Sequence, residues 1–495
     1  MESQSQVLER LRTAFESRVT IPEKFRRTQL TNLMSMIKDN EEQIVNALHK
    51  DLTKPKFEAI LSEVEIVMNE LHCALSNLTS WMQPEYVSKN LATKLDECFV
   101  RREPLGVVLI IGPWNYPMQL LIVPLIGAIA AGNCVVIKPS EVSAATDNLI
   151  TELIPKYLSK DCYAVVRGGA KETQALLKNR FDHIFYTGSQ AVARVVLQAA
   201  AVHLTPVTLE LGGKCPCLIY GRVNATAAAH RLVWSKFFNA GQSCVAPDYV
   251  LCSKATCDAL VPALRQVLED FYGSDIQKSP DMSRIVTPKH WTRLMGLLNR
   301  TKGKVIVGGE HDEKDRYIAP TVVVDVAEDD ALMEEEIFGP ILPILTIESL
   351  EESIKLTKTK EKPLAFYVFS DESSVVKKVL ENSSSGGFCS NDGIVHMALP
   401  GLPFGGVGMC QAGLLRKRCK RCSHMRNQCS LCHPGNSGFG HYHGHWGFEA
   451  FSHQRAVMLR GWALEKLNAL RYPPYSDEKL SWLRWTTSPK SCSIM

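Results

Sequence analysis

The sequence lacks a marked excess of either charge. Among its 495 residues, 56 Lys and Arg stand against 52 Asp and Glu, and the formal net charge is +4. So mild a balance gives no reason to expect a nucleic-acid partner. The first 50 residues also lack the apolar core of a signal peptide. Without an export route, most of the 16 cysteines are expected to remain reduced thiols.

Long apolar runs are equally scarce. The longest, residues 118–131, is too short to span a bilayer and carries Pro124, so it predicts a buried helix and no membrane span. Internal repeats and low-complexity linkers are also missing from the sequence. With 45% hydrophobic and 22% charged residues, the composition is that of a soluble globular protein. The length favours two or three domains.

The first half of the chain shows helices followed by buried strands. Residues 1–82 carry apolar side chains at helical spacing among charges. Continuous apolar runs at 107–111, 134–137 and 183–186 each end in a polar turn and alternate with helical stretches. Strands of this kind predict a parallel sheet that is covered on both faces. Ligands of such sheets bind beyond the carboxyl ends of the strands, where these turns lie.

A second α/β pattern follows. Apolar strands again alternate with helical stretches, which predicts a second domain with its own sheet. The expected strands are 248–252, 304–307, 321–326, 365–369 and 386–390, and the expected helices include 258–272 and 374–382.

A carboxylate and a thiol stand in the stretch 208–246 between these two patterns. Glu210 precedes two glycines, and Cys244 follows a run of small and amide residues. A thiol with a nearby general base is the minimum for covalent catalysis on a carbonyl group. Residue type alone is weak support, because a lone cysteine is seldom a nucleophile and a glutamate beside glycines fits a solvated turn. A cysteine hydrolase is a further interpretation, but no histidine stands in a recognisable partner motif.

Seven motifs in order make the chain similar to the aldehyde dehydrogenase superfamily. Their order and their span, from about residue 100 to 455, make chance similarity negligible. The Asn391-Asp392 pair and the C-terminal extension resemble the class 3 branch, in particular its B-type, lipidated members. The motifs are Pro113-Trp114-Asn115-Tyr116-Pro117, Lys138-Pro139-Ser140-Glu141, Thr187-Gly188-Ser189, Glu210-Leu211-Gly212-Gly213-Lys214, Asn239-Ala240-Gly241-Gln242-Ser243-Cys244, Glu336-Ile337-Phe338-Gly339-Pro340 and Pro403-Phe404-Gly405-Gly406.

The resemblance implies an α/β aldehyde dehydrogenase fold: a Rossmann-like cofactor domain, an α/β catalytic domain and a small bridging β element. Class 3 relatives are dimers, so a homodimer is expected. The implied divisions are an NAD(P)-binding domain (1–86 and 104–209), a bridging hairpin (87–103), a catalytic domain (210–408), a Cys-rich basic insertion (409–435), a C-terminal bridging segment (436–470) and a lipidated tail (471–495).

The resemblance also implies three catalytic roles. Cys244 is the nucleophile that adds to the aldehyde. The side-chain amide of Asn115 and the backbone N–H of Cys244 stabilise the oxyanion. Glu210 is the general base that activates water against the thioester, a role that a raised pKa would favour.

NAD or NADP is the implied cofactor. By resemblance, Lys138 and Glu141 hold the adenosine ribose, and Glu336 and Phe338 position the nicotinamide ribose and ring. Ala193 stands where a second glycine is common, and its methyl group is expected to crowd the phosphate turn slightly. The remaining implied cofactor residues are Trp114, Gly188 and Ser189.

Residues 409–435 depart from the family pattern. Removing them would join Gly405-Gly406-Val407-Gly408 to Asn436-Ser437-Gly438 as a familiar glycine-rich loop, so we interpret the segment as an insertion from alternative splicing. Cys419-x₂-Cys422-x₆-Cys429-x₂-Cys432 permits a zinc site, but its spacer is short for one. A disordered, reducible loop is the other interpretation. The insertion could also impair catalysis, leaving a membrane-tethered isoform of low activity.

The last four residues, Cys492-Ser493-Ile494-Met495, fit the C-a-a-X pattern, and a terminal Met favours farnesyl. A lipidated tail predicts a place on the cytoplasmic face of a membrane, either the plasma membrane or a lipid droplet. The unprenylated chain would be cytosolic. A site beside lipids favours medium- and long-chain aldehydes as substrates.

Overall fold

The computed structural model describes residues 2–408, 436–462 and 465–488. The insertion with its cysteines, and Cys492, therefore lie outside the described residues. Within these ranges, no helix has the length and apolarity needed to cross a membrane. The same ranges hold no group of three or more His, Cys, Asp or Glu side chains that could bind a metal ion.

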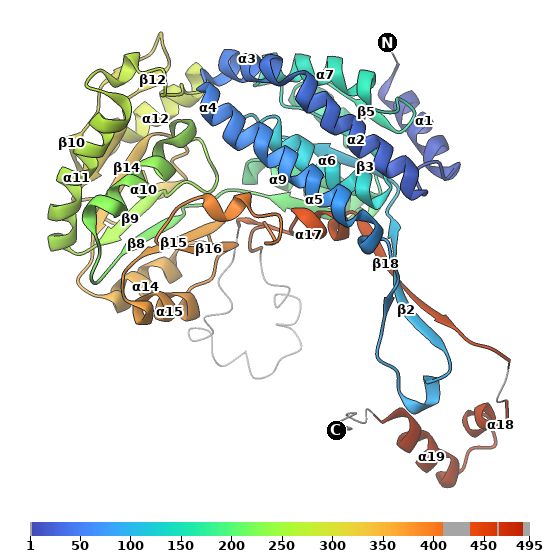
Figure 1. Cartoon of the computed structure of the whole chain (residues 1–495). Helices are drawn as coiled ribbons and strands as arrows, with labels where there is room; N and C mark the ends of the chain where they lie inside the picture. The colour runs from blue at the N-terminus through green and yellow to red at the C-terminus, as the bar shows by residue number, and fades with distance from the viewer. Residues whose placement is uncertain (1, 409–435, 463–464, 489–495) are drawn as a thin grey trace.

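Helices fill the N-terminal region, as the periodicity predicts, and pack beside the first sheet (Figure 1). Their apolar sides share one core with that sheet. A π-helical turn, Ile60–Val64, interrupts the last of them. The helices are α1 (Gln4–Glu16), α2 (Glu23–Asp39), α3 (Glu41–Leu52), α4 (Lys56–Ala59) and α5 (Glu65–Trp81).

The first sheet has six strands in the order β17-β7-β6-β3-β4-β5. The five strands from β7 to β5 are parallel, and the three strands predicted for this region lie at its centre. Their runs of β-branched and aromatic residues are buried on both faces. The strands are β3 (Val107–Ile111), β4 (Cys134–Lys138), β5 (Tyr163–Val165), β6 (His183–Thr187), β7 (Val207–Glu210) and β17 (Gly438–Phe439), with helices α6 (Gln119–Ala131), α7 (Ala144–Tyr157), α8 (Ala170–Leu176) and α9 (Gln190–His203) between them.

The second sheet has seven strands in the order β10-β13-β14-β9-β8-β15-β16. Only β10, at one edge, runs antiparallel to its neighbour. β8 and β14 are additional to the predicted strands. The strands are β8 (Pro216–Ile219), β9 (Tyr249–Cys252), β10 (Lys304–Val307), β13 (Thr321–Val324), β14 (Ile341–Thr346), β15 (Ala365–Phe369) and β16 (Gly387–Ser390), and the main helices are α10 (Ala225–Phe237), α11 (Lys254–Tyr272), α12 (Pro288–Arg300), α14 (Leu350–Thr359) and α15 (Ser373–Asn382).

A three-stranded antiparallel sheet extends away from these two domains (Figure 1). It consists of β1 (Glu85–Tyr86), β2 (Glu97–Pro104) and β18 (Ser452–Leu459), and β18 pairs with the whole of β2. The short helices α18 (Glu465–Asn468) and α19 (Asp477–Thr487) lie at its far end. Two α/β sheets and a small β element confirm the predicted fold class.

The segment 436–470, predicted as a C-terminal bridging segment, contacts the first domain as well as the small sheet. Its first strand, β17, pairs antiparallel with β7 at the edge of the first sheet. Helix α17 (Gly444–Ala450) packs on α6, where a Cβ added to Gly127 would lie 2.9 Å from the backbone of Gly447. After α17, the strand β18 of the same segment joins the small sheet by pairing with β2.

Candidate active site

A cleft of about 520 Å³ lies between the two α/β domains. The carboxyl ends of β3, β6 and β7 reach it from the first domain, and the loop before β9 reaches it from the second. This is where parallel sheets place their ligands. The predicted site residues that line it are Trp114, Asn115, Gly188, Ser189, Glu210, Cys244, Glu336 and Phe338.

Cys244 follows a backbone in an unusual conformation. Asn239, Ala240 and Gly241 all have positive φ angles, of 55°, 53° and 72°. For the two non-glycine residues this costs roughly 1–3 kcal/mol each. At Gly241 a Cβ would lie 2.3 Å from the carbonyl oxygen of Gly339, so glycine is required. The loop is therefore strained, and the contacts around it must hold the thiol in place.

Gln242 supplies several of these contacts. Its Nε2 donates to the carbonyl oxygen of Arg284 at 3.0 Å, and its Oε1 accepts from the backbone N–H of Val286 at 2.9 Å. The Cys244 side chain remains partly exposed. Burial raises the pKa of the Cys244 thiol, and the carboxyl groups of Glu336 and Glu210 raise it further. The thiolate is consequently disfavoured until positive charge or a proton acceptor comes near.

Asn115 follows β3 and is buried. Its Nδ2 donates to the carbonyl oxygen of Gln242 at 3.1 Å, which ties it to the loop that carries Cys244. An amide nitrogen has two hydrogens, so a second donor remains for an oxyanion. The structure thus brings the predicted oxyanion donor and the predicted nucleophile into one connected unit.

Glu210 ends β7 and is buried, in contrast to the solvated turn that its neighbouring glycines allow. β17 pairs with this end of the strand, with Gly438 directly opposite Glu210. Within the described ranges, neither carboxylate oxygen has a hydrogen-bond partner. Burial raises the pKa of Glu210 well above its ordinary value. A water-activating base needs such a pKa and free oxygens.

Glu336, Phe338 and Trp114 form the part of the cleft predicted to take the nicotinamide. The rings of Trp114 and Phe338 lie edge to face with centroids 5.4 Å apart. A Cβ at Gly212 would lie 2.1 Å from an oxygen of Glu336, so a glycine leaves room for this carboxyl group. Burial, followed by the charge of Asp248, raises the pKa of Glu336 to about 8.

The predicted phosphate turn begins α9. Ser189 caps this helix by accepting a hydrogen bond from the N–H of Val192, and the helix N-terminus faces the cleft. At Gly188 a Cβ would lie 2.4 Å from the hydroxyl of Tyr186. Ala193 is buried, and its N–H bonds to the carbonyl oxygen of Ser189 at 3.0 Å. Ala193 thus takes part in the first turn of α9, and its crowding of the phosphate approach stays a prediction.

Lys138 and Glu141 lie outside the lining of the cleft, at the end of the neighbouring strand β4. Lys138 Nζ bonds Glu141 Oε2 at 2.7 Å, with Lys138 buried and Glu141 about half exposed. Two acceptors and a cation at the end of β4 suit the hydroxyls of a ribose. In addition, one carboxyl oxygen of Glu336 has no hydrogen-bond partner among the described residues and is free to accept from a second ribose. The residues present therefore fit a nicotinamide dinucleotide.

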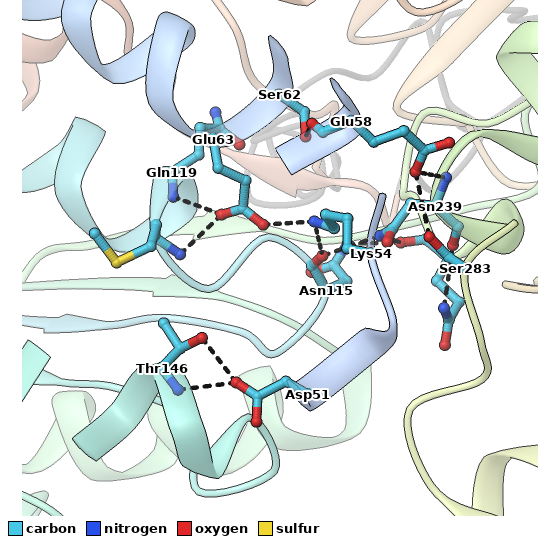
Figure 2. A network of polar contacts seen from close by, with 12 residues as sticks. Asp51, Lys54, Glu58, Ser62, Glu63, Asn115, Gln119, Thr146, Asn239 and Ser283 are labelled. Atoms are coloured by element: carbon cyan, nitrogen blue, oxygen red, sulfur yellow. Dashed lines mark hydrogen bonds and ion pairs between the residues drawn. The ribbon is translucent and has the colours of Figure 1, made fainter. Parts of the chain in front are cut away.

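Sequence reasoning missed a buried polar network beneath the site (Figure 2). Lys54, in the connection between α3 and α4, and Glu58 and Glu63, in the helical segment after it, contact the loops that carry Asn115 and Cys244. Its members lie up to 225 positions from their partners, so no local pattern signals their contacts. The one local signal for this network is that three charged residues, Lys54, Glu58 and Glu63, stand among apolar residues in a short stretch of the sequence.

Comparison with known proteins places this geometry in a family. The profile of the aldehyde dehydrogenase family matches residues 2–427. Aldehyde dehydrogenase family 3 member B1 of Homo sapiens is 50% identical over 493 residues, covering 100% of this chain and 99% of that protein. Aldehyde dehydrogenase family 3 member A2 of Mus musculus is 46% identical over 477 residues, covering 96% and 92%.

Solved structures agree with these relatives. The substrate-bound state of AldH from Staphylococcus aureus is 39% identical with a TM-score of 0.90, covering 98% of this chain and 99% of that one. The Mycobacterium tuberculosis aldehyde dehydrogenase complexed with NAD+ is 26% identical with a TM-score of 0.80, covering 94% and 92%. The motif-based prediction is confirmed: the chain belongs to the aldehyde dehydrogenase family, in its class 3, B-type branch.

Proposed function

We propose that this enzyme oxidises medium- and long-chain, lipid-derived aldehydes to carboxylic acids with NAD(P)+ through a thioester on Cys244. The observation that carries the proposal is the cleft itself, which brings Cys244, Asn115 and Glu210 together. A thiol, an oxyanion donor and a base with a raised pKa are the groups that acyl chemistry requires.

The first half of the reaction uses the thiol and the amide. The Cys244 thiol first loses its proton to solvent. Its sulfur then adds to the aldehyde carbon, and the carbonyl oxygen becomes an oxyanion that Asn115 Nδ2 stabilises. A nicotinamide cofactor, when bound, would supply the acceptor for the hydride that leaves the substrate carbon. Trp114, Phe338 and Glu336 orient the ring-binding part of the cleft. When the carbonyl double bond re-forms, the substrate carbon is held to sulfur as a thioester.

The second half uses Glu210. Its carboxylate takes a proton from water, and the oxygen of that water attacks the thioester carbon. The carbon–sulfur bond then breaks, which releases the acid and returns the Cys244 thiol. The free carboxyl oxygens of Glu210 are available for this water.

The surroundings of Cys244 support an apolar substrate. A narrow cavity of about 10 Å³ touches Cys244. Its walls are mostly apolar or aromatic, so an alkyl chain would find favourable contacts once side chains move apart to admit it. The apolar and aromatic lining residues are Tyr116, Leu120, Val245, Met397, Phe404 and Tyr442.

The residues that flank the insertion support an active enzyme over the impaired alternative. The N–H of Val407 donates to Ser437 Oγ at 2.9 Å, and the carbonyl oxygen of Ser437 accepts from the N–H of Leu211 at 3.0 Å. A Cβ at Gly406 would lie 2.0 Å from that same carbonyl oxygen. The chain therefore returns to the point at which it left, and β17 keeps its place beside Glu210.

Deleting residues 409–435 is accordingly expected to leave kcat/KM for a long-chain aldehyde nearly unchanged, because the joined ends already touch. NADH or NADPH formation by the full chain and the deletion variant, measured over aldehydes of increasing chain length, checks this. A gain of about tenfold or more on deletion, equal to about 1.4 kcal/mol in the barrier, would instead support the impaired isoform. A preference for short, polar aldehydes in both proteins would contradict the proposed substrate class.

We further propose that a farnesyl group on Cys492 tethers the enzyme to the cytoplasmic face of a membrane. One lipid chain binds only marginally, so a second contact is needed. Side chains near the C-terminus could provide it, since Trp462 is 99% exposed and Tyr475 80% exposed. Lys479 and Arg484 on α19 add positive charge for anionic lipids.

Replacing Cys492 by serine is expected to move most of the enzyme from the membrane pellet to the soluble fraction of a cell that prenylates proteins. Loss of the thiol removes the only attachment point that the C-a-a-X pattern offers. Ser491→Ala, one residue earlier, is the matched control and should stay in the pellet. Equal membrane association of Cys492→Ser and the parent chain would refute the tether.

A homodimer is the third part of the proposal. The three-stranded sheet projects from the body with many apolar side chains exposed, a surface that a second copy could cover. Sedimentation equilibrium of the full chain measures the mass of the assembly, and a monomer at micromolar concentration would contradict it. The exposed apolar residues there include Tyr86, Val87, Leu91, Leu95, Met458 and Leu459.

A further inference from the structure

Lys54 and Glu63 form an ion pair from which water is excluded. Both side chains are 0% exposed, and Lys54 Nζ lies 2.5 Å from Glu63 Oε1. Burying two charges carries a large desolvation cost that apolar residues of the same size would avoid. A buried ion pair is therefore weak evidence for a role in stability alone.

The pair holds the loop that presents Asn115 (Figure 2). Lys54 Nζ donates to the carbonyl oxygen of Asn115 at 3.2 Å and stands 4.3 Å from the centre of the Tyr116 ring. Glu63 Oε2 accepts from the backbone N–H groups of Met118 at 2.9 Å and Gln119 at 3.1 Å. The middle of the loop between β3 and α6, at Asn115, and its end, at Met118 and Gln119, are thus bound to one buried pair.

Glu63 also replaces a missing helix cap. The first N–H groups of a helix lack partners within it, and α6 has no side-chain cap from its own N-cap residue, Met118. A carboxylate at this end is favoured by the helix dipole as well. The contact therefore fixes the start of α6, and with it the backbone that leads back to Asn115.

A third charged residue of the same segment reaches the nucleophile loop. Glu58 Oε2 accepts from the backbone N–H of Asn239 at 2.9 Å, and Asn239 Nδ2 donates to the carbonyl oxygen of Asn115 at 2.9 Å. Residues five apart on an α-helix point about 140° away from each other. The π-helical turn Ile60–Val64, with its i to i+5 bonds, brings Glu58 and Glu63 closer to one side of the segment.

We propose that Lys54 and Glu63 are positioning residues for the oxyanion donor: they fix the peptide of Asn115 so that its side-chain amide faces the oxygen of a substrate bound to Cys244. Neither residue touches the reacting atoms, and both act through the Asn115 loop. The proposal rests on Asn115 as the oxyanion donor of the proposed mechanism. A displacement of about 1 Å in such a group can lower a rate by about 10²-fold.

The first test is Lys54→Met, which keeps the length of the side chain and removes its charge and its bond to Asn115. We expect kcat to fall by roughly 10- to 100-fold, with little change in KM or in cofactor affinity. The matched control is Arg26→Met, since Arg26 is a buried cation that donates to the carbonyl oxygen of Ala130 at the other end of α6. That variant should lose thermal stability and keep its kcat.

A double-mutant cycle with Asn115→Ala separates positioning from a structural role. Asn115→Ala alone should lower kcat by about 10²–10³-fold. Adding Lys54→Met to it should then cause no further loss, because the position of the Asn115 peptide no longer affects the oxyanion once the side-chain amide is gone. Independent, multiplying losses would overturn the proposal. Unchanged turnover in Asn115→Ala would remove the oxyanion assignment together with the proposal, while Cys244 would still stand as nucleophile.

The rate at which iodoacetamide alkylates Cys244 distinguishes loss of positioning from collapse of the site, because only collapse would lower this rate. The sulfur displaces iodide and forms no oxyanion, so the rate in Lys54→Met should match the parent enzyme, as followed by mass spectrometry of the Cys244 peptide. A parallel loss of alkylation would mean that the loop of Cys244 itself is disordered, and it would overturn the specific role. If Lys54→Met fails to fold, Lys54→Met with Glu63→Gln removes both charges, and wild-type kcat in that variant would contradict the proposal equally.

Discussion

In the Cys244→Ser variant, turnover of aldehydes is expected to fall by about 10³-fold or more, as loss of a covalent nucleophile does in other enzymes, while cofactor binding is kept. A serine hydroxyl has the size of the thiol but is a far weaker nucleophile. The contacts of Gln242 and Asn115 that hold the loop involve backbone and neighbouring side chains, so they survive the change. NADH or NADPH formation measures turnover, and titration calorimetry measures cofactor affinity.

Cys73→Ser is the matched control for this variant. Cys73 is another partly exposed thiol, on α5, away from the residues that line the cleft. Its replacement should leave turnover as it is. Turnover of Cys244→Ser at the parent rate would remove the covalent mechanism, whereas loss of cofactor binding in the same variant would show that the substitution damages the cleft.

The Glu210→Gln variant is expected to stall after the first half of the reaction. An amide of the same shape cannot take a proton from water, so steady-state turnover should fall by about 10²–10⁴-fold. Transfer of the hydride does not need this base, and one equivalent of reduced cofactor should still form in a rapid burst. Stopped-flow absorbance shows the burst, and mass spectrometry of the intact protein shows the acyl group held on the enzyme.

The pH dependence of this step follows from burial. Because the pKa of Glu210 is raised, the basic form that activates water accumulates as the pH rises, and thioester hydrolysis by the parent enzyme should accelerate in the same direction. Glu210→Gln should lose this dependence in single-turnover hydrolysis. The pKa of the Cys244 thiol is also raised, so the rate of its addition to the aldehyde should increase with pH as well. The pH dependence of Cys244 alkylation measures that contribution separately. A pH-independent hydrolysis step in the parent enzyme would argue against Glu210 as the base.

Runs of apolar residues and short motifs in the sequence were sufficient to predict the central strands of the first sheet and the main residues of the site. The apolar runs of β3, β4 and β6 identified the centre of the first sheet, since a strand buried on both faces has few polar residues. Motifs placed Cys244 and Glu210 in one cleft. Burial of Glu210 could not be predicted in this way, because β17, which pairs with the end of β7, lies more than 200 residues later in the chain.

Other features escaped prediction for identifiable physical reasons. β14 lies inside the second sheet although Pro343 stands within it, and a proline ordinarily argues against a central strand. The pair Lys54 and Glu63 has no local signature, since charged residues usually face solvent. Its partners, Asn115 and Gln119, become neighbours only when α6 packs against the N-terminal helices.

Because Val407 and Ser437 are in contact, the chain between them, residues 409–435, is a suitable place to insert another sequence. Where two backbone points already touch, lengthening the chain between them costs only the entropy of a larger loop, about 0.6 kcal/mol for each doubling of its length. Tolerance of added sequence is thus a property of the junction and is independent of what is added. A fluorescent domain or an affinity tag placed in residues 409–435 could report on the enzyme in cells while its two termini stay native.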